Sequence, residues 1–210
     1  MSPNKKVYFS NYIDIDNITT KPEITNMGSH RYFIKIPFLN RSTGKTAIVI
    51  MKNPSMAGKT DNKGRLLSDD TIYNVCDYLF KSQTPKFKEV IILNIMSIYG
   101  GTLSNILSKI TSLNKLSSPH NTCTLKKILG NSDDNKFIIA AWGGPPGYKE
   151  TEESFFTRKD LHSYYDQQIK TVLKFLKGKT VYKVGEFSSK KYPKHGAVWY
   201  DYEPLNKYNF

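Results

Sequence analysis

Short apolar runs alternate with amphipathic segments along the chain. A short continuous apolar run is typical of a buried strand, and apolar residues three or four positions apart indicate one face of a helix. Strands are predicted at 31–39, 45–51, 89–96, 137–142 and 180–185. Helices are predicted at 71–83, 103–116, 122–129 and 160–178, the last with Gly178 in the position expected after a helix C-cap. We expect the first two strands to form a hairpin across the turn at 40–44.

This alternation predicts an α/β fold: a three-layer α/β/α domain with a central, mostly parallel sheet. We expect residues 1–210 to form a single domain, with an N-terminal arm or short edge element at 1–28 and a loop-rich aromatic tail at 197–210. Ligands of such sheets bind beyond the carboxyl ends of the strands. Four unusual clusters follow strand ends: Asn53-Pro54-Ser55, Asn94, Trp142-Gly143-Gly144 and 185–196. The sequence therefore predicts a site at one shared edge of the sheet.

The segment NPSMAGKT, residues 53–60, is close to the phosphate-binding pattern G-x-x-x-x-G-K-[ST]. Asn53 replaces the first glycine, however, and Pro54 has no backbone N–H to donate to a phosphate. A helix should also begin at Lys59, but a loop-like stretch follows. We therefore do not expect a nucleoside-triphosphate site in this segment.

The charge of the chain favours a polyanionic partner. Thirty-one Lys and Arg residues against eighteen Asp and Glu residues give a net charge of +13. Lysines near phosphates release condensed counterions, so DNA is the expected partner, although lysines that only solvate the surface are the alternative. No apolar run approaches the roughly 20 residues of a membrane span, and we expect a cytoplasmic protein with no membrane partner. The sequence identifies no protein partner.

Cysteines and histidines give no sign of a cofactor. Cys76 and Cys123 do not form a metal-binding or disulfide pattern, and we expect both to be buried, reduced thiols. The histidines at 30, 120 and 162 are dispersed, without the spacing of metal ligands. We predict no metal site and no cofactor.

Five motifs occur in a fixed order: Met51-Lys52-Asn53-Pro54-Ser55-Met56-Ala57, Asp69-Asp70-Thr71-Ile72, Leu93-Asn94, Ala141-Trp142-Gly143, and Lys183-Val184-Gly185 with Pro193-Lys194-His195. Together they resemble a little-characterised bacterial domain family, often found in mobile elements and phages, over about residues 31–196. The chain departs from the family pattern in two places. The segment between Ala57 and Asp69 is lengthened, and the usual proline before Thr71 is missing.

Four of these elements also resemble, more distantly, those of uracil-DNA glycosylases: residues 50–55, 90–96, 138–144 and 190–196. In those enzymes, a loop with Asp-Pro or Asn-Pro positions the attacking water, an asparagine at a strand end reads the flipped base, and a histidine lies near the leaving base. The resemblance implies a uracil-DNA-glycosylase-like fold. It also implies the removal of a base from DNA.

Breaking an N-glycosidic bond builds positive charge on the sugar and negative charge on the departing base. The candidate catalytic residues are Asn53, Asp69, Asp70 and His195. The candidate base-binding residues are Pro54, Ser55, Asn94, Trp142 and Gly143. The candidate nucleic-acid-binding residues are Lys59, Lys183, Lys190, Lys191, Tyr192 and Lys194.

Structural alternatives exist for these candidates. Asp69 or Asp70 could cap the helix that follows, and Asn53-Pro54 could be only a turn. Asn94 could satisfy a buried strand end, and Trp142 could pack in the core. His195 could be an ordinary surface imidazole.

Our hypothesis from the sequence is a DNA glycosylase-like enzyme that flips out and excises a modified or non-standard base. The resemblance implies a role in phage defence or mobile-element conflict. One alternative is a non-enzymatic DNA-binding protein, because Asn53 stands where the most active glycosylases have Asp. A second alternative is a nucleotide-processing enzyme that acts on free nucleotides.

Overall fold

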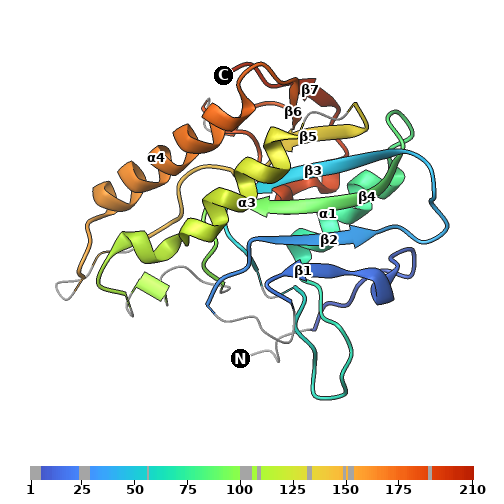
Figure 1. Ribbon diagram of the computed structural model, residues 1–210, viewed down its shortest axis with the longest axis horizontal. Coiled ribbons are helices and arrows are strands. Elements are labelled where there is room, and N and C mark those ends of the chain that lie inside the picture. Colours follow the sequence, from blue (N-terminus) through green and yellow to red (C-terminus); the bar gives the residue numbers. More distant parts are fainter. Residues whose placement is uncertain are drawn as a thin grey trace.

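The computed structural model describes residues 6–23, 29–55, 57–99, 106–107, 110–131, 134–148, 150, 154–188 and 191–210. These residues form a seven-stranded mixed sheet in the order β1-β2-β4-β3-β5-β6-β7 (Figure 1). Its strands are β1 (Thr19–Lys21), β2 (Phe33–Pro37), β3 (Lys45–Met51), β4 (Phe87–Asn94), β5 (Lys136–Ala140), β6 (Val181–Val184) and β7 (Leu205–Lys207).

The centre of the sheet is parallel and its edges are antiparallel. β4, β3, β5 and β6 run in one direction, so their carboxyl ends share one edge. β1 and β2 on one side and β7 on the other pair antiparallel. The prediction of a mostly parallel sheet therefore holds for these four central strands, whereas the whole sheet is mixed.

The expected hairpin between the first two long strands is wrong. β4 lies between β2 and β3, antiparallel to the first and parallel to the second. The residues from Thr46 to Met51 are all buried, as in a central strand that is covered on both faces. The turn at 40–44 has a length that suits a hairpin. The sequence of the turn does not indicate that β4, from later in the chain, lies between the two strands that the turn connects.

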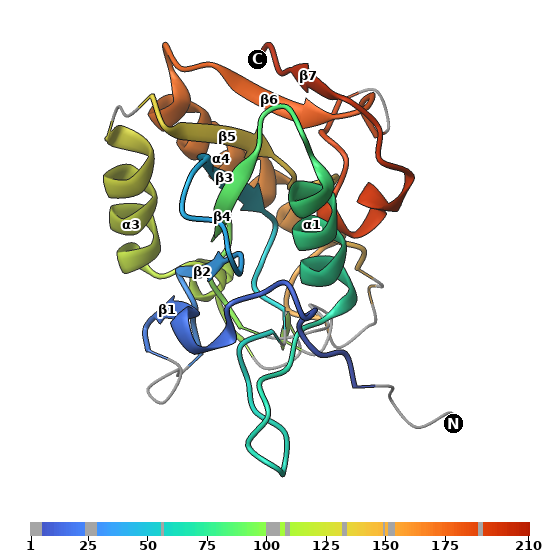
Figure 2. The same cartoon turned by 90° about the vertical axis from the view of Figure 1, so that its right-hand side faces the viewer.

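Helices cover both faces of the sheet (Figure 2). The side chains of β3 alternate between two cores: Ala47, Val49 and Met51 pack with helix α1 (Asp70–Lys81), whereas Ile48 and Ile50 pack on the opposite face. That second core is completed by helices α3 (Pro119–Gly130) and α4 (Arg158–Leu176). The predicted helices at 71–83, 122–129 and 160–178 correspond to α1, α3 and α4. Cys76 of α1 is buried as expected, whereas the expectation is wrong for Cys123 of α3, which is exposed.

The ends of the helices follow local capping chemistry. Asp69 caps α1, and Ser118 caps α3 just before a proline at its first position. Thr157 and Asp160 form a reciprocal capping box at the start of α4. Gly178 lies just beyond the other end of α4 with φ +77°, a left-handed conformation that glycine adopts without steric cost. These boundaries follow from short sequence signals.

The N-terminal segment, expected as an arm or a short edge element, contains edge strand β1 and a 3-10 turn, η1 (Ile15–Asn17), so the second alternative holds for its described part. Two other segments differ from their predictions. The expected aromatic tail contains a 3-10 segment, η4 (Gly196–Asp201), and edge strand β7. In the expected helix at 103–116, residues 103–105 and 108–109 lie outside the described part, 106–107 are helical, and η3 (Leu113–Leu116) is a 3-10 turn.

The lengthened segment between Ala57 and Asp69 forms a narrow two-stranded ribbon. The backbone N–H of Gly58 donates to Leu67, and the N–H of Leu67 donates to Lys59. At its tip, the Asp61 carboxylate pairs with Arg65 at 2.9 Å. The ribbon projects from the body of the molecule (Figures 1 and 2). No helix begins at Lys59, which agrees with rejection of the phosphate-loop pattern.

Candidate functional site at the carboxyl edge of the sheet

The strand order creates a topological switch point beside β3. From β3 the chain passes through α1 to β4 on one side, and it later returns to β5 on the other side. Open α/β sheets bind ligands at such a switch point, outside the carboxyl ends of the strands. Met51 pairs in register with Asn94, and the N–H of Ala141 donates to Ile50. The polar clusters after β3, β4 and β5 therefore begin next to one another.

Asp69 holds the loop after β3 against the start of α1. One carboxylate oxygen accepts the N–H of Ile72 at 3.0 Å, which is the N-cap contact. The other oxygen accepts the Ser55 hydroxyl and the N–H of Ala57. All these contacts fit a structural carboxylate. The next residue, Asp70, is exposed at the first position of the helix.

A buried arginine also binds the loop that follows β3, through the carbonyl of Ala57. Arg31 is only 1% exposed, and its guanidinium donates to the carbonyl of Ala57. The Tyr99 hydroxyl donates to the same carbonyl at 3.2 Å, and the Tyr99 ring lies 5.3 Å from the guanidinium. Burial lowers the pKa of Arg31 to about 10. Tyr99 and Asp69 raise it, but their effect is smaller than that of burial. Arg31 was not among the candidates from the sequence, because a lone arginine at the first position of a predicted strand resembles a surface residue.

His195 faces the glycine that follows β5. A methyl group at Gly143 would lie 3.0 Å from the His195 Cβ, so this glycine permits a close approach of the two segments. The N–H of Ala197 donates to Nδ1 of His195 at 3.2 Å, so the neutral ring carries its proton on Nε2. Burial and the Lys52 ammonium lower the pKa of His195 from 6.5 to about 4. His195 is therefore a neutral hydrogen-bond donor at physiological pH.

Lys52 is a second functional candidate at the end of β3. It is half-buried, and its ammonium lies 5.8 Å from the centre of the Tyr165 ring. Burial lowers the pKa of Lys52 from 10.5 to about 8. Lys52 stands within the first of the five sequence motifs, but the motif itself assigns it no role. The available signal was a lysine placed directly after a continuous apolar strand.

Asn94 is a buried polar side chain without a partner. It is 1% exposed, and within the described residues neither its amide nitrogen nor its amide oxygen has a hydrogen bond. The backbone carbonyl of Asn94 accepts a hydrogen bond from the side chain of Asn121 at 3.0 Å. An orphaned buried amide costs about 1–3 kcal/mol, so its presence calls for an explanation. The alternative that Asn94 satisfies a strand end does not agree with these contacts.

Trp142 belongs to the core rather than to an open platform. Its side chain is 0% exposed and packs edge-on against Tyr208, with ring centres 5.6 Å apart. The Tyr165 hydroxyl donates to the carbonyls of Trp142 and Gly143 at 2.8 and 3.2 Å. The indole therefore has no free face on which a base could stack. Gly143 remains at the proposed edge, in contact with His195.

Several predicted nucleic-acid contacts are already engaged within the protein. Lys183 is buried and donates to Gly185, Lys191 pairs with Asp166 at 3.1 Å, and Lys194 pairs with Glu203. The Tyr192 hydroxyl also donates to Asp166. Lys59 is exposed, with its ammonium 4.9 Å from the centre of the Tyr99 ring. Lys190 lies outside the described residues.

Asn53 and Pro54 form the loop directly after Lys52. Asn53 is half-buried and its amide nitrogen donates to the carbonyl of Pro54 at 3.2 Å, while Pro54 itself is buried. The structure therefore brings together the loop of Asn53, Pro54 and Ser55 with Asp69, and it brings His195 against Gly143. Besides burial, the Lys52 ammonium lowers the pKa of His195, and the Asp69 carboxylate raises it.

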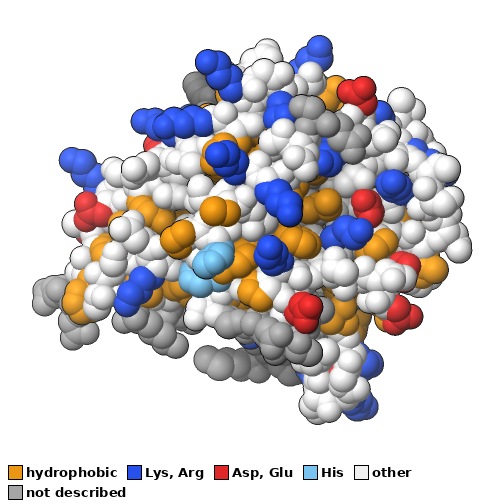
Figure 3. All heavy atoms as spheres, viewed as in Figure 1, with side chains coloured by type: hydrophobic (Ala, Val, Ile, Leu, Met, Phe, Trp, Pro, Cys, Tyr) orange, Lys and Arg blue, Asp and Glu red, His pale blue; other side chains and the backbone are white. Residues whose placement is uncertain are grey.

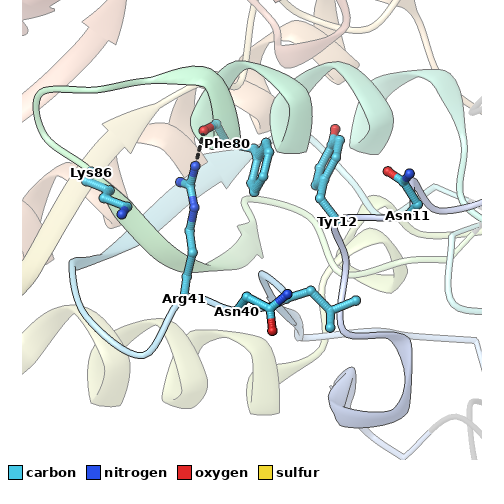
Figure 4. A pocket seen from close by; sticks show the side chains of 7 residues that line it. Asn11, Tyr12, Asn40, Arg41, Phe80 and Lys86 are labelled. Atoms are coloured by element: carbon cyan, nitrogen blue, oxygen red, sulfur yellow. Dashed lines mark hydrogen bonds between the residues drawn. The ribbon is translucent and has the colours of Figure 1, made fainter.

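A hollow lies at the opposite end of the sheet. It has a volume of about 490 Å³ and is lined by Asn11, Tyr12, Leu39, Asn40, Arg41, Phe80 and Lys86 (Figure 4). The Arg41 guanidinium lies 3.9 Å from the Phe80 ring centre and donates to the carbonyls of Phe80 and Phe87. These donors hold the end of α1 against the sheet. We therefore regard this hollow as structural.

Three further observations concern metal ligands, membrane-spanning helices and the distribution of surface charge. Across the residues that the structure describes, no group of three or more His, Cys, Asp or Glu side chains is placed to hold a metal ion. None of the helices in these ranges is long and apolar enough to span a membrane. Lys and Arg side chains are scattered over the face shown in Figure 3, rather than gathered into one patch.

Comparison with known proteins identifies a family. No curated protein and no solved structure gives a significant match to the chain. The family described as "Protein of unknown function (DUF1643)" matches residues 31–196. Because this match covers most of the 210 residues, the chain belongs to the DUF1643 family.

Proposed function

We propose that this protein is a DNA glycosylase-like enzyme that excises a modified or non-standard base by base flipping and hydrolysis of the N-glycosidic bond. The carboxyl edge of β3, β4 and β5 is its active site, on a uracil-DNA-glycosylase-like three-layer fold. Its chemistry needs a reader for the base, a donor for the departing base, and groups that orient water near the sugar.

The observation that carries the proposal is the orphaned amide of Asn94. An amide offers one acceptor and two donor hydrogens, which match the hydrogen-bonding edge of an extruded base. Within the described residues, nothing else uses these groups. A protein keeps such an unsatisfied group most readily where a ligand satisfies it.

His195 supplies the donor for the departing base. Its Nε2–H is available because Nδ1 accepts the N–H of Ala197. As the bond breaks, negative charge grows on the base, and a fixed neutral donor stabilises that charge without first losing a proton. A pKa of about 4 keeps the ring neutral under physiological conditions.

Asn53 and Asp70 are assigned to the sugar side of the bond. The amide oxygen of Asn53 can orient water, and the exposed carboxylate of Asp70 can activate it or stabilise the cationic sugar. Asp69 receives a different role. Its oxygens already bind Ile72, Ser55 and Ala57, so it positions the loop.

Replacement of Asn94 separates function from stability. Asn94→Leu removes an unsatisfied amide at nearly constant volume, so we expect unchanged or higher stability together with loss of base excision. Oligonucleotides that carry uracil, hydroxymethylcytosine or glucosylated cytosine would be incubated with the protein and then cleaved with alkali. Stability would be measured by urea unfolding.

Asn121 provides the matched control. It is equally buried, but its amide nitrogen donates to the carbonyls of Asn94 and Ile95. Asn121→Leu should therefore lower the free energy of unfolding by about 1–3 kcal/mol. A loss of stability in Asn94→Leu as large as that in Asn121→Leu would identify Asn94 as a structural residue and contradict the proposal.

A free nucleotide is the second candidate substrate. It is favoured by the internal pairing of Lys183, Lys191 and Lys194, which leaves fewer cations to follow a DNA backbone. Release of base from nucleosides or nucleotides, but from no oligonucleotide, would select this candidate. Binding of oligonucleotides without abasic product would instead select a non-enzymatic DNA-binding protein.

A further inference from the structure

Lys52 is a cationic group at this edge to which base hydrolysis gives no role. It directly follows β3 at the switch point of the sheet, and its backbone carbonyl accepts the N–H of Met96. Its half-buried ammonium faces the ring of Tyr165 and lies close enough to His195 to repel a proton from that ring. In the described parts of the chain, no carboxylate forms an ion pair with it.

An unpaired, half-buried lysine is costly in its charged form. Burial disfavours an ammonium relative to the neutral amine, and lysine is the basic residue that responds most readily. Other lysines of the described chain illustrate the contrast, since Lys191 and Lys194 each contact a carboxylate. A neutral amine is a nucleophile for carbonyl carbon.

We propose that Lys52 attacks C1′ of the abasic deoxyribose left after the base departs, and that the resulting Schiff base gives this site an abasic-lyase activity. The inference rests on the proposed function, because the abasic sugar is the product of base excision. It adds a second reaction and a covalent intermediate to that function.

The reaction balances without an external oxidant or reductant. The Lys52 nitrogen forms a bond to C1′ of the open-chain aldehyde, and the aldehyde oxygen leaves as water after it takes up two protons. The iminium then draws electrons from C2′, whose proton passes to solvent. The C3′–O bond breaks, and the 3′ phosphate leaves with the electron pair. Hydrolysis of the imine regenerates the amine.

Reductive trapping tests this step directly. The full chain would be mixed with an oligonucleotide that already contains one abasic site, in the presence of sodium borohydride, which reduces an iminium to a stable secondary amine. We expect a covalent protein–DNA adduct, which peptide mass mapping locates at Lys52. Because the abasic site is preformed, the result does not depend on whether the protein can remove a base.

Two lysine-to-arginine substitutions distinguish the nucleophilic role of Lys52 from the effect of its positive charge. Lys52→Arg keeps a cation but cannot form an imine, so the adduct and strand cleavage should disappear while the fold is retained, as checked by circular dichroism. Lys45→Arg is the matched control: it lies at the other end of β3, where its ammonium donates to Asp134, and it should trap as the unaltered protein does.

The pH dependence gives a second readout. The neutral amine becomes more abundant as pH rises through about 8, the lowered pKa of Lys52. Adduct formation should therefore increase between pH 7 and pH 9, whereas an ordinary exposed lysine would respond at higher pH.

The outcomes are distinguishable from failure of base excision itself. An adduct at Lys52 without base release would support the lysine chemistry and remove the glycosylase proposal. Base release without an adduct, with Lys52→Arg still active, would overturn the lysine chemistry and leave the glycosylase proposal intact. An adduct spread over surface lysines, undiminished in Lys52→Arg, would also overturn it.

Discussion

Two adjacent aspartates at the start of α1, Asp69 and Asp70, have different roles although they are the same residue type. Asp69 has both oxygens engaged, with the N–H of Ile72 on one side and the loop of Ser55 and Ala57 on the other. Asp70 is exposed, and with the described residues it makes no comparable contact. From sequence alone, either residue could be the cap. The distinction depends on which one precedes the first helical turn.

Substitution of the two aspartates should separate stability from activity. Asp69→Ala removes the cap, worth about 1 kcal/mol, and frees the loop, so we expect a total loss of about 2–4 kcal/mol in urea unfolding. Asp70→Ala should change stability by about 0.5 kcal/mol or less, because the side chain is exposed, yet it should abolish base excision. Full activity in a folded Asp70→Ala protein would remove Asp70 from the mechanism.

At the scale of elements, the position of His195 depends on the packing of η4 against α1. Asn74 donates to the carbonyl of Ala197 at 2.9 Å, and the hydroxyl of Tyr78 donates to Glu203 at 2.7 Å. The rings of Tyr78 and Trp199 lie 5.2 Å apart. The segment that begins at His195 is therefore held to the helix whose cap anchors the opposite side of the site.

Gly196 permits this close approach. An added methyl group there would lie 2.5 Å from Cγ2 of Val75, so Gly196→Ala should lower the free energy of unfolding by about 1–3 kcal/mol and should displace His195. Base release should fall even under conditions in which the variant stays folded. Thermal unfolding and an activity assay measure the two effects.

A double mutant and a second glycine provide controls. Val75→Ala makes room for the new methyl group, so the combined Gly196→Ala and Val75→Ala protein should lose less stability than the sum of the single losses. Gly130→Ala, at the end of α3 with no atom within 4 Å of the added methyl, should be neutral or slightly stabilising. Strict additivity of the first pair would contradict the proposed steric contact.

The elements were largely predictable, but their neighbours in space were not. Capping residues and apolar periodicity indicated α1, α3, α4 and the strands, because these signals lie within a few residues of each other. Pairing of β2 with β4 joins segments more than fifty residues apart, and only tertiary packing selects it. For the same reason the site residues Arg31 and Lys52 escaped notice. Their burial arises from distant segments, such as the one that carries Tyr99.

At the scale of the whole molecule, a net charge of +13 overstates the free positive surface near the site. Lys194 is paired with Glu203 and Lys191 with Asp166, both in or beside the segment that carries His195. A lysine that is already paired with a carboxylate releases fewer counterions when it approaches DNA, because the carboxylate neutralises part of its positive charge. The charge therefore favours a general attraction to DNA more than a dedicated track for its backbone.

Release of one of these lysines should change the salt dependence of DNA binding. Glu203→Gln frees Lys194 beside the site, so we expect tighter binding at low salt and a slope of log K against log salt that is steeper by about one. Glu89→Gln is matched in charge, but Glu89 lies near the start of β4, at the opposite end of that strand from Asn94, and its partner is Lys35 of β2. Its slope should stay closer to that of the unaltered protein. Fluorescence anisotropy over a salt series gives both slopes. Equal steepening in the two variants would mean that DNA senses only the total charge, and that the segment around His195 does not contact its backbone.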